Sequence, residues 1–268
     1  MQRFLAEADF DALVAAFNEA FSDYLVPMHL TAPQLREMCV RRGVDLELSP
    51  AEFDGERIAG YTLNALGTFN GVPSAYDSGT GVVPSHRRRG LARHLLEVSF
   101  PALRERGATQ MVLEVLEPNE RAAALYRAIG FEVTRRLLCW RYNGAAALDG
   151  EANEIAIDDV PAHFCDVAPS WQNSIESLRR SGDDRRVIAV DGGYAIVHAA
   201  TGDLAQLAVD PARRRRGIGT RLLRHAAAVA AKPLRILNVE ESMSGFLAAA
   251  GAEPFIAQLE MLRATLDT

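Results

Sequence analysis

Two short segments of the chain combine several arginines with a glycine directly before a predicted helix. Residues 82–96 read VVPSHRRRGLARHLL, and residues 209–223 read VDPARRRRGIGTRLL. The first N–H groups of a helix lack intrahelical partners and carry partial positive charge. Glycine lets an anion approach these groups, and arginine adds charge-assisted hydrogen bonds. Both segments therefore predict a cradle for a phosphate or pyrophosphate.

A simpler interpretation competes with the cradle. Arginines before a helix can form a solvated face, and a glycine there can serve only as a turn residue. The second copy, again between a strand and a helix, favours the cradle, because a motif gains weight from its structural context. The sequence contains neither G-x-x-x-x-G-K-[ST] nor G-x-G-x-x-G, which excludes a P-loop and a Rossmann fingerprint.

The two arginine-rich segments belong to an internal repeat. Eight positions of the first segment recur in the second, and Gly217 is the counterpart of Gly90. One match in each half, at a long separation, predicts duplicated domains rather than a solenoid. We expect domains at 1–145 and 152–268, joined near 143–153, where the residues are small and polar.

Hydrophobic spacing and turn residues indicate the elements that carry these segments. In the first half we expect helices at 9–21, 31–41, 89–106 and 119–129, and strands at 47–54, 57–69, 74–83, 110–116 and 131–142. In the second half we expect strands at 154–158, 186–191, 194–200, 203–209, 234–239 and 254–265, and helices at 170–180, 217–231 and 242–250. This order predicts an α+β fold of two domains, each a mixed, mostly antiparallel sheet with helices on both faces.

Composition bounds the class of protein. The 268 residues include 49% hydrophobic and 24% charged residues, which suits a globular chain with a sizeable core. The net charge of −6 argues against a globally basic nucleic-acid binder. Three widely spaced cysteines form no metal-ligand pair or disulfide framework, so we expect no metal and a cytoplasmic location. We expect no secretory leader and no membrane partner, because no long apolar run occurs.

The motifs resemble those of the GNAT acetyltransferase superfamily. That family's cofactor motif, [R/Q]-x-x-G-x-[G/A], matches residues 87–92 and again residues 214–219. The first half also carries the family's later signature, NERAAALY, at 119–126. The match in the second half is strong over 203–224 and weak afterwards. The arrangement is similar to the tandem subgroup of the family, and the resemblance implies an acyltransferase that uses acetyl-CoA as cosubstrate.

The resemblance also implies where acetyl-CoA binds. In this family the strand before the cradle separates from the next parallel strand, and the pantetheine arm lies in that gap, paired here with backbone groups of Val82 and Val83. The Val83 N–H would be the oxyanion-hole donor for the thioester oxygen. Asn119 would contact the pantetheine arm, although an N-cap is its simpler role. The pyrophosphate would be held by backbone groups of Arg88, Arg89, Gly90, Leu91, Ala92 and Arg93.

Tyr126 lies about two helical turns after Asn119. The resemblance implies that it is the general acid toward the CoA sulfur, and a core aromatic is the alternative. A phenol with a pKa of about 10 is protonated at pH 7 and can donate. In the second half Leu247 and Glu240 stand in place of Tyr126 and Asn119, with Asn238 as a partial substitute. We therefore expect the second half to hold a CoA phosphate but to be less suited to chemistry.

An amine acceptor is mostly protonated at pH 7, so its acetylation needs a general base. Asp77 and Glu114, on neighbouring predicted strands, are the candidates, and each could instead form a salt bridge or a structural hydrogen bond. Asp23, Tyr24 and His29 cluster between the first two helices, where family members shape the acceptor pocket. An acidic and aromatic cluster of this kind suits a cationic amine.

Three functional hypotheses follow. The leading one is an acetyl-CoA-dependent N-acetyltransferase whose first half acetylates an amine of a small molecule by direct attack on the thioester. The second is a degenerate module that binds acyl-CoA in a regulatory or structural role without turnover. The third is nucleic-acid binding through residues 87–89 and 213–216, which the negative charge and the lack of interleaved aromatics oppose. The sequence does not name the acceptor, the preferred acyl chain or the oligomeric state.

Overall fold

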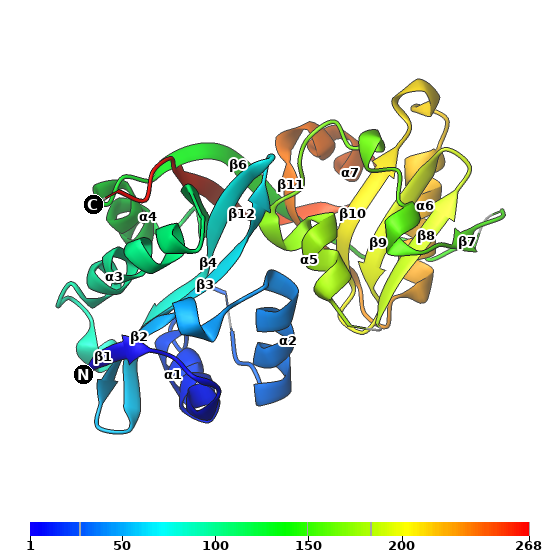
Figure 1. The fold of residues 1–268 in the computed structure, drawn as a ribbon. Helices are drawn as coiled ribbons and strands as arrows, with labels where there is room; N and C mark the ends of the chain where they lie inside the picture. Colours follow the sequence, from blue (N-terminus) through cyan, green and yellow to red (C-terminus); the bar gives the residue numbers. More distant parts are fainter. Residues whose placement is uncertain (27, 149, 183, 268) are drawn as a thin grey trace. The chain divides into compact units, whose positions relative to one another are not determined.

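The computed structural model describes residues 1–267 except residues 27, 149 and 183 (Figure 1). The chain divides into two compact units. Unit 1 comprises Met1–Thr134 and Glu260–Thr268, and unit 2 comprises Arg135–Leu259. Within the described part of the chain, no helix is both long and apolar enough to cross a membrane.

Unit 1 is built on a mixed sheet. Its strands β1 to β5 lie side by side in chain order, antiparallel up to β4, and β4 and β5 run parallel. In Figure 1, α1 and α2 lie on one side of β3 and β4, and α3 lies on the other. The elements are β1 (Gln2–Phe4), α1 (Phe10–Ala20), α2 (Ala32–Arg42), β2 (Pro50–Asp54), β3 (Arg57–Phe69), β4 (Val72–Val82), α3 (Leu91–Glu105), β5 (Gln110–Leu116) and α4 (Glu120–Ala128).

The first two helices of unit 1 form where the sequence offers apolar residues at helical spacing or a capping residue. Phe10, Leu13 and Phe17 recur at helical spacing on α1 and are buried against the sheet. α2 begins at the N-cap Thr31, whose side chain accepts from the Gln34 N–H at 3.5 Å. These elements confirm the predicted helices at 9–21 and 31–41 to within a residue or two at each end.

Unit 2 has the same design. Strands β6, β11, β10, β9, β8 and β7 follow one another in that order, and among these strands, as far as they are described, only β10 and β11 run parallel. Strands β6 and β12 each contribute residues to both units. The elements are β6 (Glu132–Tyr142), β7 (Asn153–Glu154), α5 (Ile175–Arg180), β8 (Arg185–Val190), β9 (Gly193–His198), β10 (Asp203–Val209), α6 (Ile218–Val229), β11 (Leu234–Glu240), α7 (Ser244–Ala249) and β12 (Glu253–Arg263).

Side chains of β9 point alternately to the two faces of the sheet in unit 2, and both faces are packed. Ala195 and Val197 pack in one cluster with Leu222 of α6. Tyr194 and Ile196 point to the opposite face and pack with α5. The predicted α+β class, with mostly antiparallel sheets and helices on both faces, is confirmed.

Two predicted elements of the second half are wrong in part. The strand expected at 154–158 is only the two residues of β7, and a 3-10 turn follows at Ile157–Asp159. The helix expected at 170–180 is split into a 3-10 turn at Trp171–Asn173 and α5. Ser174 separates them, because its backbone is extended and its hydroxyl accepts from the Ser177 N–H as the N-cap of α5.

The linker expected at 143–153 lies inside unit 2, so the compact units do not end there. Their cuts fall instead within β6 and β12, the two strands that serve both units. The boundaries 1–145 and 152–268 describe the duplicated sequence, and we keep them as a proposal about its two copies.

Candidate functional site

The turn before α3 has the geometry of an anion cradle. Gly90 is the N-cap of α3, in the left-handed region at φ 76°, and Arg88 is also left-handed at φ 63°. The first intrahelical bond runs from the His94 N–H to the Gly90 C=O at 3.0 Å. The N–H groups of Leu91, Ala92 and Arg93 precede that bond. A Cβ added at Gly90 would meet no described atom within 4 Å, so an anion has room at this helix end.

Arg87, the first residue of the motif, is held by the protein itself. Its Nε donates to the Val82 C=O at 3.1 Å, and its Nη2 donates to the Ala20 C=O at 2.8 Å. Its Nη1 pairs with the Asp23 carboxylate at 2.6 Å. Arg87 therefore fastens the cradle turn to the segment that follows α1. Asp23, predicted in the acceptor pocket, is committed to this ion pair.

Unit 2 repeats the turn in detail. Gly217 is the left-handed N-cap of α6 at φ 81°, and Arg215 has φ 64°. The Arg214 Nε donates to the Val209 C=O at 3.1 Å, and its Nη1 pairs with the Asp166 carboxylate at 2.6 Å. The glycines of the two units therefore occupy matching positions, as the repeat predicts.

The backbone pairing of β4 with β5 stops next to the cradle, and we call the unpaired stretch the β4–β5 gap. Their parallel pairing ends at Asp77 and Leu113, although β4 continues to Val82 and β5 to Leu116. β4 also bulges there, because Ser78 has no partner in its register with β3. The resemblance to the GNAT family implies that the pantetheine arm would lie in a gap of this kind.

The structure corrects one predicted role beside that gap. The Val83 N–H donates to the Ala59 C=O at 3.0 Å, so it is used by β3 and cannot serve as an oxyanion donor. Backbone groups of neighbouring residues alternate in direction along a strand. The Val82 N–H therefore faces away from β3, toward the gap.

A buried carboxylate and a buried phenol lie where β4 and β5 separate. The Tyr126 hydroxyl donates to Asp77 Oδ2 at 3.2 Å. The same carboxylate accepts from the Gly79 N–H at 2.9 Å and the Thr80 hydroxyl at 2.8 Å. Burial raises the pKa of Asp77 to about 6. Burial and the neighbouring Asp77 hold the pKa of Tyr126 well above its usual value, so the pair combines a proton acceptor with a protonated phenol at pH 7.

Asn119 is the N-cap of α4, because its side-chain oxygen accepts from the Ala122 N–H at 3.2 Å. Burial raises the pKa of Tyr24, and a hydrogen bond with Asn119 works against that rise. Tyr24 and Asn119 therefore lie together, whereas His29 is exposed. The contact of Asn119 with pantetheine stays a prediction.

Glu114 occupies a different setting from Asp77. It accepts a short hydrogen bond from the hydroxyl of buried Tyr76. Of the carboxylates predicted as bases, Asp77 is the one that the structure joins to Tyr126, as far as the described residues show. Over that same part of the chain, no group of three His, Cys, Asp or Glu side chains could hold a metal ion.

In unit 2 the corresponding gap is bridged by side chains. The pairing of β10 with β11 ends at Leu204 and Ile236. Beyond it, Gln206 Nε2 donates to the Asn173 C=O at 2.6 Å. The Asn173 side chain donates in turn to the Leu237 C=O at 2.8 Å, so the chain of contacts runs from β10 to β11.

The residues of unit 2 that stand in place of Tyr126 and Asn119 are also engaged in contacts within the protein. Leu247 is 1% exposed in the core. Glu240 forms an ion pair with Arg135 at 2.8 Å. Asn238 is buried and left-handed at φ 57°, and it accepts from the Gln258 amide at 2.8 Å. None of these three supplies a phenol beside a carboxylate.

Sequence reasoning missed one tyrosine at the site. Tyr61 on β3 is fully buried and lies directly across from Gly81 on β4. A signal for it exists, because the sequence Gly-Tyr recurs as Gly193-Tyr194 at the start of β9. Tyr194 lies across from Ala208 in the same way.

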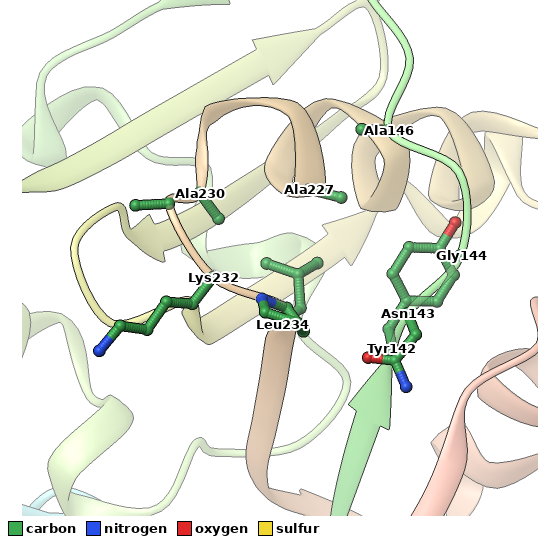
Figure 2. Close-up of a pocket in the computed structure, with 10 residues that line it drawn as sticks. Tyr142, Asn143, Gly144, Ala146, Ala227, Ala230, Lys232 and Leu234 are labelled. Carbon is green, nitrogen blue, oxygen red and sulfur yellow. The ribbon is translucent and has the colours of Figure 1, made fainter.

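A cavity of about 310 Å³ lies elsewhere in unit 2 (Figure 2). Its lining includes Tyr142, Asn143, Ala227 and Lys232, close to the C-terminal end of α6. The cradle of unit 2 is at the N-terminal end of the same helix, about 18 Å away at 1.5 Å per residue. The cavity is therefore separate from the cradle.

Family models match both halves of the chain. The acetyltransferase (GNAT) family matches residues 10–131, and an acetyltransferase (GNAT) domain matches residues 182–255. N-alpha-acetyltransferase 30 of Schizosaccharomyces pombe is 29% identical over 102 residues, 38% of this chain and 68% of that protein. Mycothiol acetyltransferase of Nocardia farcinica is 39% identical over 98 residues, but these cover 33% of this chain and 32% of that protein.

A solved structure resembles the whole chain. The tandem GNAT protein from the clavulanic acid biosynthesis pathway superposes with a TM-score of 0.64 at 19% identity, covering 100% of this chain and 99% of that one. At this identity the likeness concerns the fold. With the two cradles and the two family matches, it shows that this chain belongs to the GNAT acetyltransferase family and carries two GNAT domains in tandem.

Proposed function

We infer that unit 1 transfers the acetyl group of acetyl-CoA to an amine of a small-molecule acceptor. The observation that carries this proposal is the Asp77–Tyr126 hydrogen bond at the point where β4 and β5 separate. A carboxylate suited to act as a base and a phenol suited to act as an acid thus meet where the pairing of β4 with β5 ends. This arrangement supports chemistry in unit 1 more than binding alone.

The residues of unit 1 fit acetyl-CoA, which supplies an acetyl thioester when bound. The pyrophosphate would lie against the N–H groups of Leu91, Ala92 and Arg93, with Arg88, Arg89 and Gly90 forming the turn. The open space at Gly90 supports this assignment. The pantetheine arm would lie in the β4–β5 gap, where it would meet the Val82 N–H and Asn119.

Asp77 and Tyr126 divide the proton transfers. The acceptor nitrogen must lose a proton as it bonds to the acetyl carbon, and the sulfur gains one as the C–S bond breaks. Ionised Asp77 takes the first proton, directly or through water, since its pKa of about 6 leaves it ionised at pH 7. Tyr126 donates the second, because its raised pKa keeps it protonated.

Unit 2 is better suited to a binding or structural role. It keeps the glycine cradle, but its gap is bridged through Gln206 and Asn173, and Leu247 replaces the phenol. We infer that unit 2 does not turn over. In this proposal the enzyme hypothesis applies to unit 1, and the hypothesis of a degenerate acyl-CoA-binding module applies to unit 2.

The test is an assay of thiol release from acetyl-CoA with three kinds of amine: glycinamide for a free α-amine, spermidine and glucosamine. We expect amine-dependent release that Asp77→Asn and Tyr126→Phe both reduce. Leu247→Ala, in unit 2, should lower thermal stability without a specific loss of kcat at a temperature where the protein is folded. Binding of acetyl-CoA with no release for any amine class would overturn the proposal in favour of a binding module.

A further inference from the structure

The carboxylate of Asp77 ends a chain of hydrogen bonds that begins on β3. Its Oδ2 accepts from the Thr80 hydroxyl at 2.8 Å. The Thr80 hydroxyl oxygen lies 3.1 Å from that of Thr62, the fully buried residue directly across from it on β3. A threonine hydroxyl has one hydrogen, and an ionised carboxylate only accepts. Thr80 therefore donates its hydrogen to Asp77, and Thr62 donates to Thr80.

Asp77 lies beside a bulge that the protein holds in place. Ser78 has no partner in the register of β4 with β3, and its carbonyl accepts from Arg42 of α2 at 2.8 Å. On the other side of the bulge, the Gly79 N–H donates to Asp77 Oδ1 at 2.9 Å. Thr80 then lies in register with β3 again. The bulge thus brings the Thr80 hydroxyl back to the carboxylate three residues before it.

Unit 2 lacks every side-chain hydroxyl and carboxylate of this arrangement. The bulge of each unit and the Gly-Tyr pair of β3 and β9 set the correspondence between the positions. Apolar residues stand in unit 2 at the places of Asp77, Thr80, Thr62 and Tyr126, namely Leu204, Leu207, Ala195 and Leu247 in that order. Unit 2 builds the equivalent strand pair without the two hydroxyls, so the pairing itself does not need them. Their absence together with the carboxylate and the phenol indicates that the threonines serve the Asp77–Tyr126 pair.

Resting on the function proposed above, we propose that Thr80 is the positioning residue of the base: oriented by Thr62, its hydroxyl holds the Asp77 carboxylate ionised and in place where the pairing of β4 with β5 ends. Burial alone favours the neutral acid, which cannot take a proton from an amine. The hydrogen bond from Thr80 favours the ionised form, because a charged acceptor binds a donor more strongly. When Asp77 takes the amine proton, both threonines keep their own protons, so they act through Asp77 and not on the substrate.

The other groups around Asp77 do not change charge near neutral pH. Among the described residues, the titratable and charged side chains that act on Asp77 are Arg42 of α2, Tyr61 of β3, Tyr76 of β4 and Tyr126 of α4. Burial raises the pKa of each of the three phenols well above its usual value, so they stay neutral, and an arginine stays charged. On β5, Asp77 is paired with Leu113, and the next residue, Glu114, binds the Tyr76 hydroxyl.

The test follows the side-chain carboxyl carbon of Asp77 by NMR in the full chain, labelled with ¹³C at the aspartate carboxyls, and needs no substrate. Asp77→Asn identifies the signal by its loss. In Thr80→Val, which exchanges the hydroxyl for a methyl group, we expect the titration midpoint to rise from about 6 by roughly one pH unit. This is the low end for a donor to a charged group, because Thr80 is half-buried and water replaces part of the bond. Thr80→Ser keeps the donor and should restore the wild-type midpoint.

Kinetics connects this midpoint with the proposed chemistry. In the thiol-release assay, the acidic limb of kcat in Thr80→Val should move with the NMR midpoint, which makes kcat about fivefold lower at pH 6, a loss that shrinks toward pH 9. Thr62→Val removes the donor to Thr80, so we expect a smaller shift in the same direction. Thr68→Val is the matched control, because it makes the same exchange at an exposed position further along β3. It should leave the midpoint and the pH profile unchanged.

The outcomes separate the positioning role from the enzyme function. An unchanged Asp77 midpoint in Thr80→Val, or an equal rise in Thr80→Ser, overturns the positioning role even if every variant releases thiol. A lower melting temperature of Thr80→Val with an unmoved midpoint also overturns it, because the threonine pair is then only structural. A raised midpoint in Thr80→Val, with no thiol release by the wild type for any amine, would keep the hold of Thr80 on Asp77 and refute the acetyltransferase.

Discussion

The Tyr126 phenol donates its hydrogen bond to Asp77, 3.2 Å away, in a buried part of unit 1. The proposed acid is therefore held by the proposed base before any substrate binds. To protonate sulfur, Tyr126 must turn its proton away from the carboxylate, which becomes easier once Asp77 has taken a proton from the amine. The hydrogen bond couples the two transfers in that order.

Tyr126→Phe removes this hydroxyl and keeps the ring. The leaving thiolate departs without full protonation, so we expect kcat to fall by roughly 10- to 100-fold, the low end for general acid catalysis. Acetyl-CoA affinity should change little. Ionised Asp77 also loses one donor, so the acidic limb of the pH–rate profile should move to higher pH. Steady-state kinetics from pH 5 to 9 measures both effects, and a kcat within twofold of wild type would remove Tyr126 from the mechanism.

Asp77 should make stability depend on pH. Burial raises its pKa to about 6 in the folded protein, whereas an unfolded aspartate titrates near about 3.9. The folded state thus holds the proton more tightly, and stability from this group falls as pH rises from about 4 to about 6. At about 1.4 kcal/mol per pKa unit, Asp77→Asn should gain about 2 kcal/mol on wild type between pH 4 and pH 7. Urea unfolding at four pH values tests this, and a constant difference would contradict the buried titration.

The same variant should lose activity. Removal of the base predicts a kcat lower by roughly 10²- to 10⁴-fold. In wild type, kcat should rise with pH through about 6 as Asp77 ionises. A variant that gains stability at pH 7 but loses turnover separates a catalytic carboxylate from a structural one. Full activity in Asp77→Asn would transfer the role of base to another group.

Gly90→Asp should weaken acetyl-CoA binding strongly, because a carboxylate would enter the anion cradle. Gly90→Ala is its matched control, since both variants carry a Cβ at φ 76° and share a strain of about 1–2 kcal/mol. Gly217→Asp should affect turnover less, because unit 2 lacks the phenol. Calorimetry and kinetics on the three variants separate the effect of the added charge from that of backbone strain. They also compare the same change in unit 1 and in unit 2. Loss of turnover in Gly217→Asp alone would show that unit 2, and not unit 1, is the active unit.

Arg87→Ala should destabilise unit 1 rather than merely remove a phosphate ligand. It deletes donors to the Val82 and Ala20 carbonyls and the ion pair with Asp23. We expect a loss of about 2 kcal/mol, given roughly 1 kcal/mol per neutral hydrogen bond and more for charged ones. Arg89→Ala, on the exposed turn, is the control and should leave stability nearly unchanged. Chemical denaturation decides, and equal stability of the two variants would refute the fastening role.

The cradles were predictable because their causes are local. The glycines, the helix start and the arginines of each cradle all lie within about a dozen residues of one another. Turn residues likewise mark both ends of β3 at Arg57–Phe69, as predicted. Tyr126 was predictable only through the family resemblance. Its partner Asp77 was a candidate, but their contact joins residues far apart in the chain.

The remaining features depend on partners that no local pattern specifies. The direction of the Val83 N–H follows from the register of β4 against β3 and the bulge at Ser78. The ion pair of Asp23 with Arg87 joins residues that are distant in sequence. These are properties of strand pairing and long-range packing, which hydrophobic spacing does not encode.

Unit 1 is made of Met1–Thr134 and Glu260–Thr268, so its second piece is synthesised only after all of unit 2. Arg263 donates to the Ile129 carbonyl at the end of α4 and lies over the Phe100 ring. A nascent chain that has released α4 still lacks this support until all of unit 2 has been translated. Unit 1 therefore cannot be completed before unit 2 has been synthesised, and a chain truncated before Glu260 would carry Tyr126 on a helix that lacks its contact with Arg263.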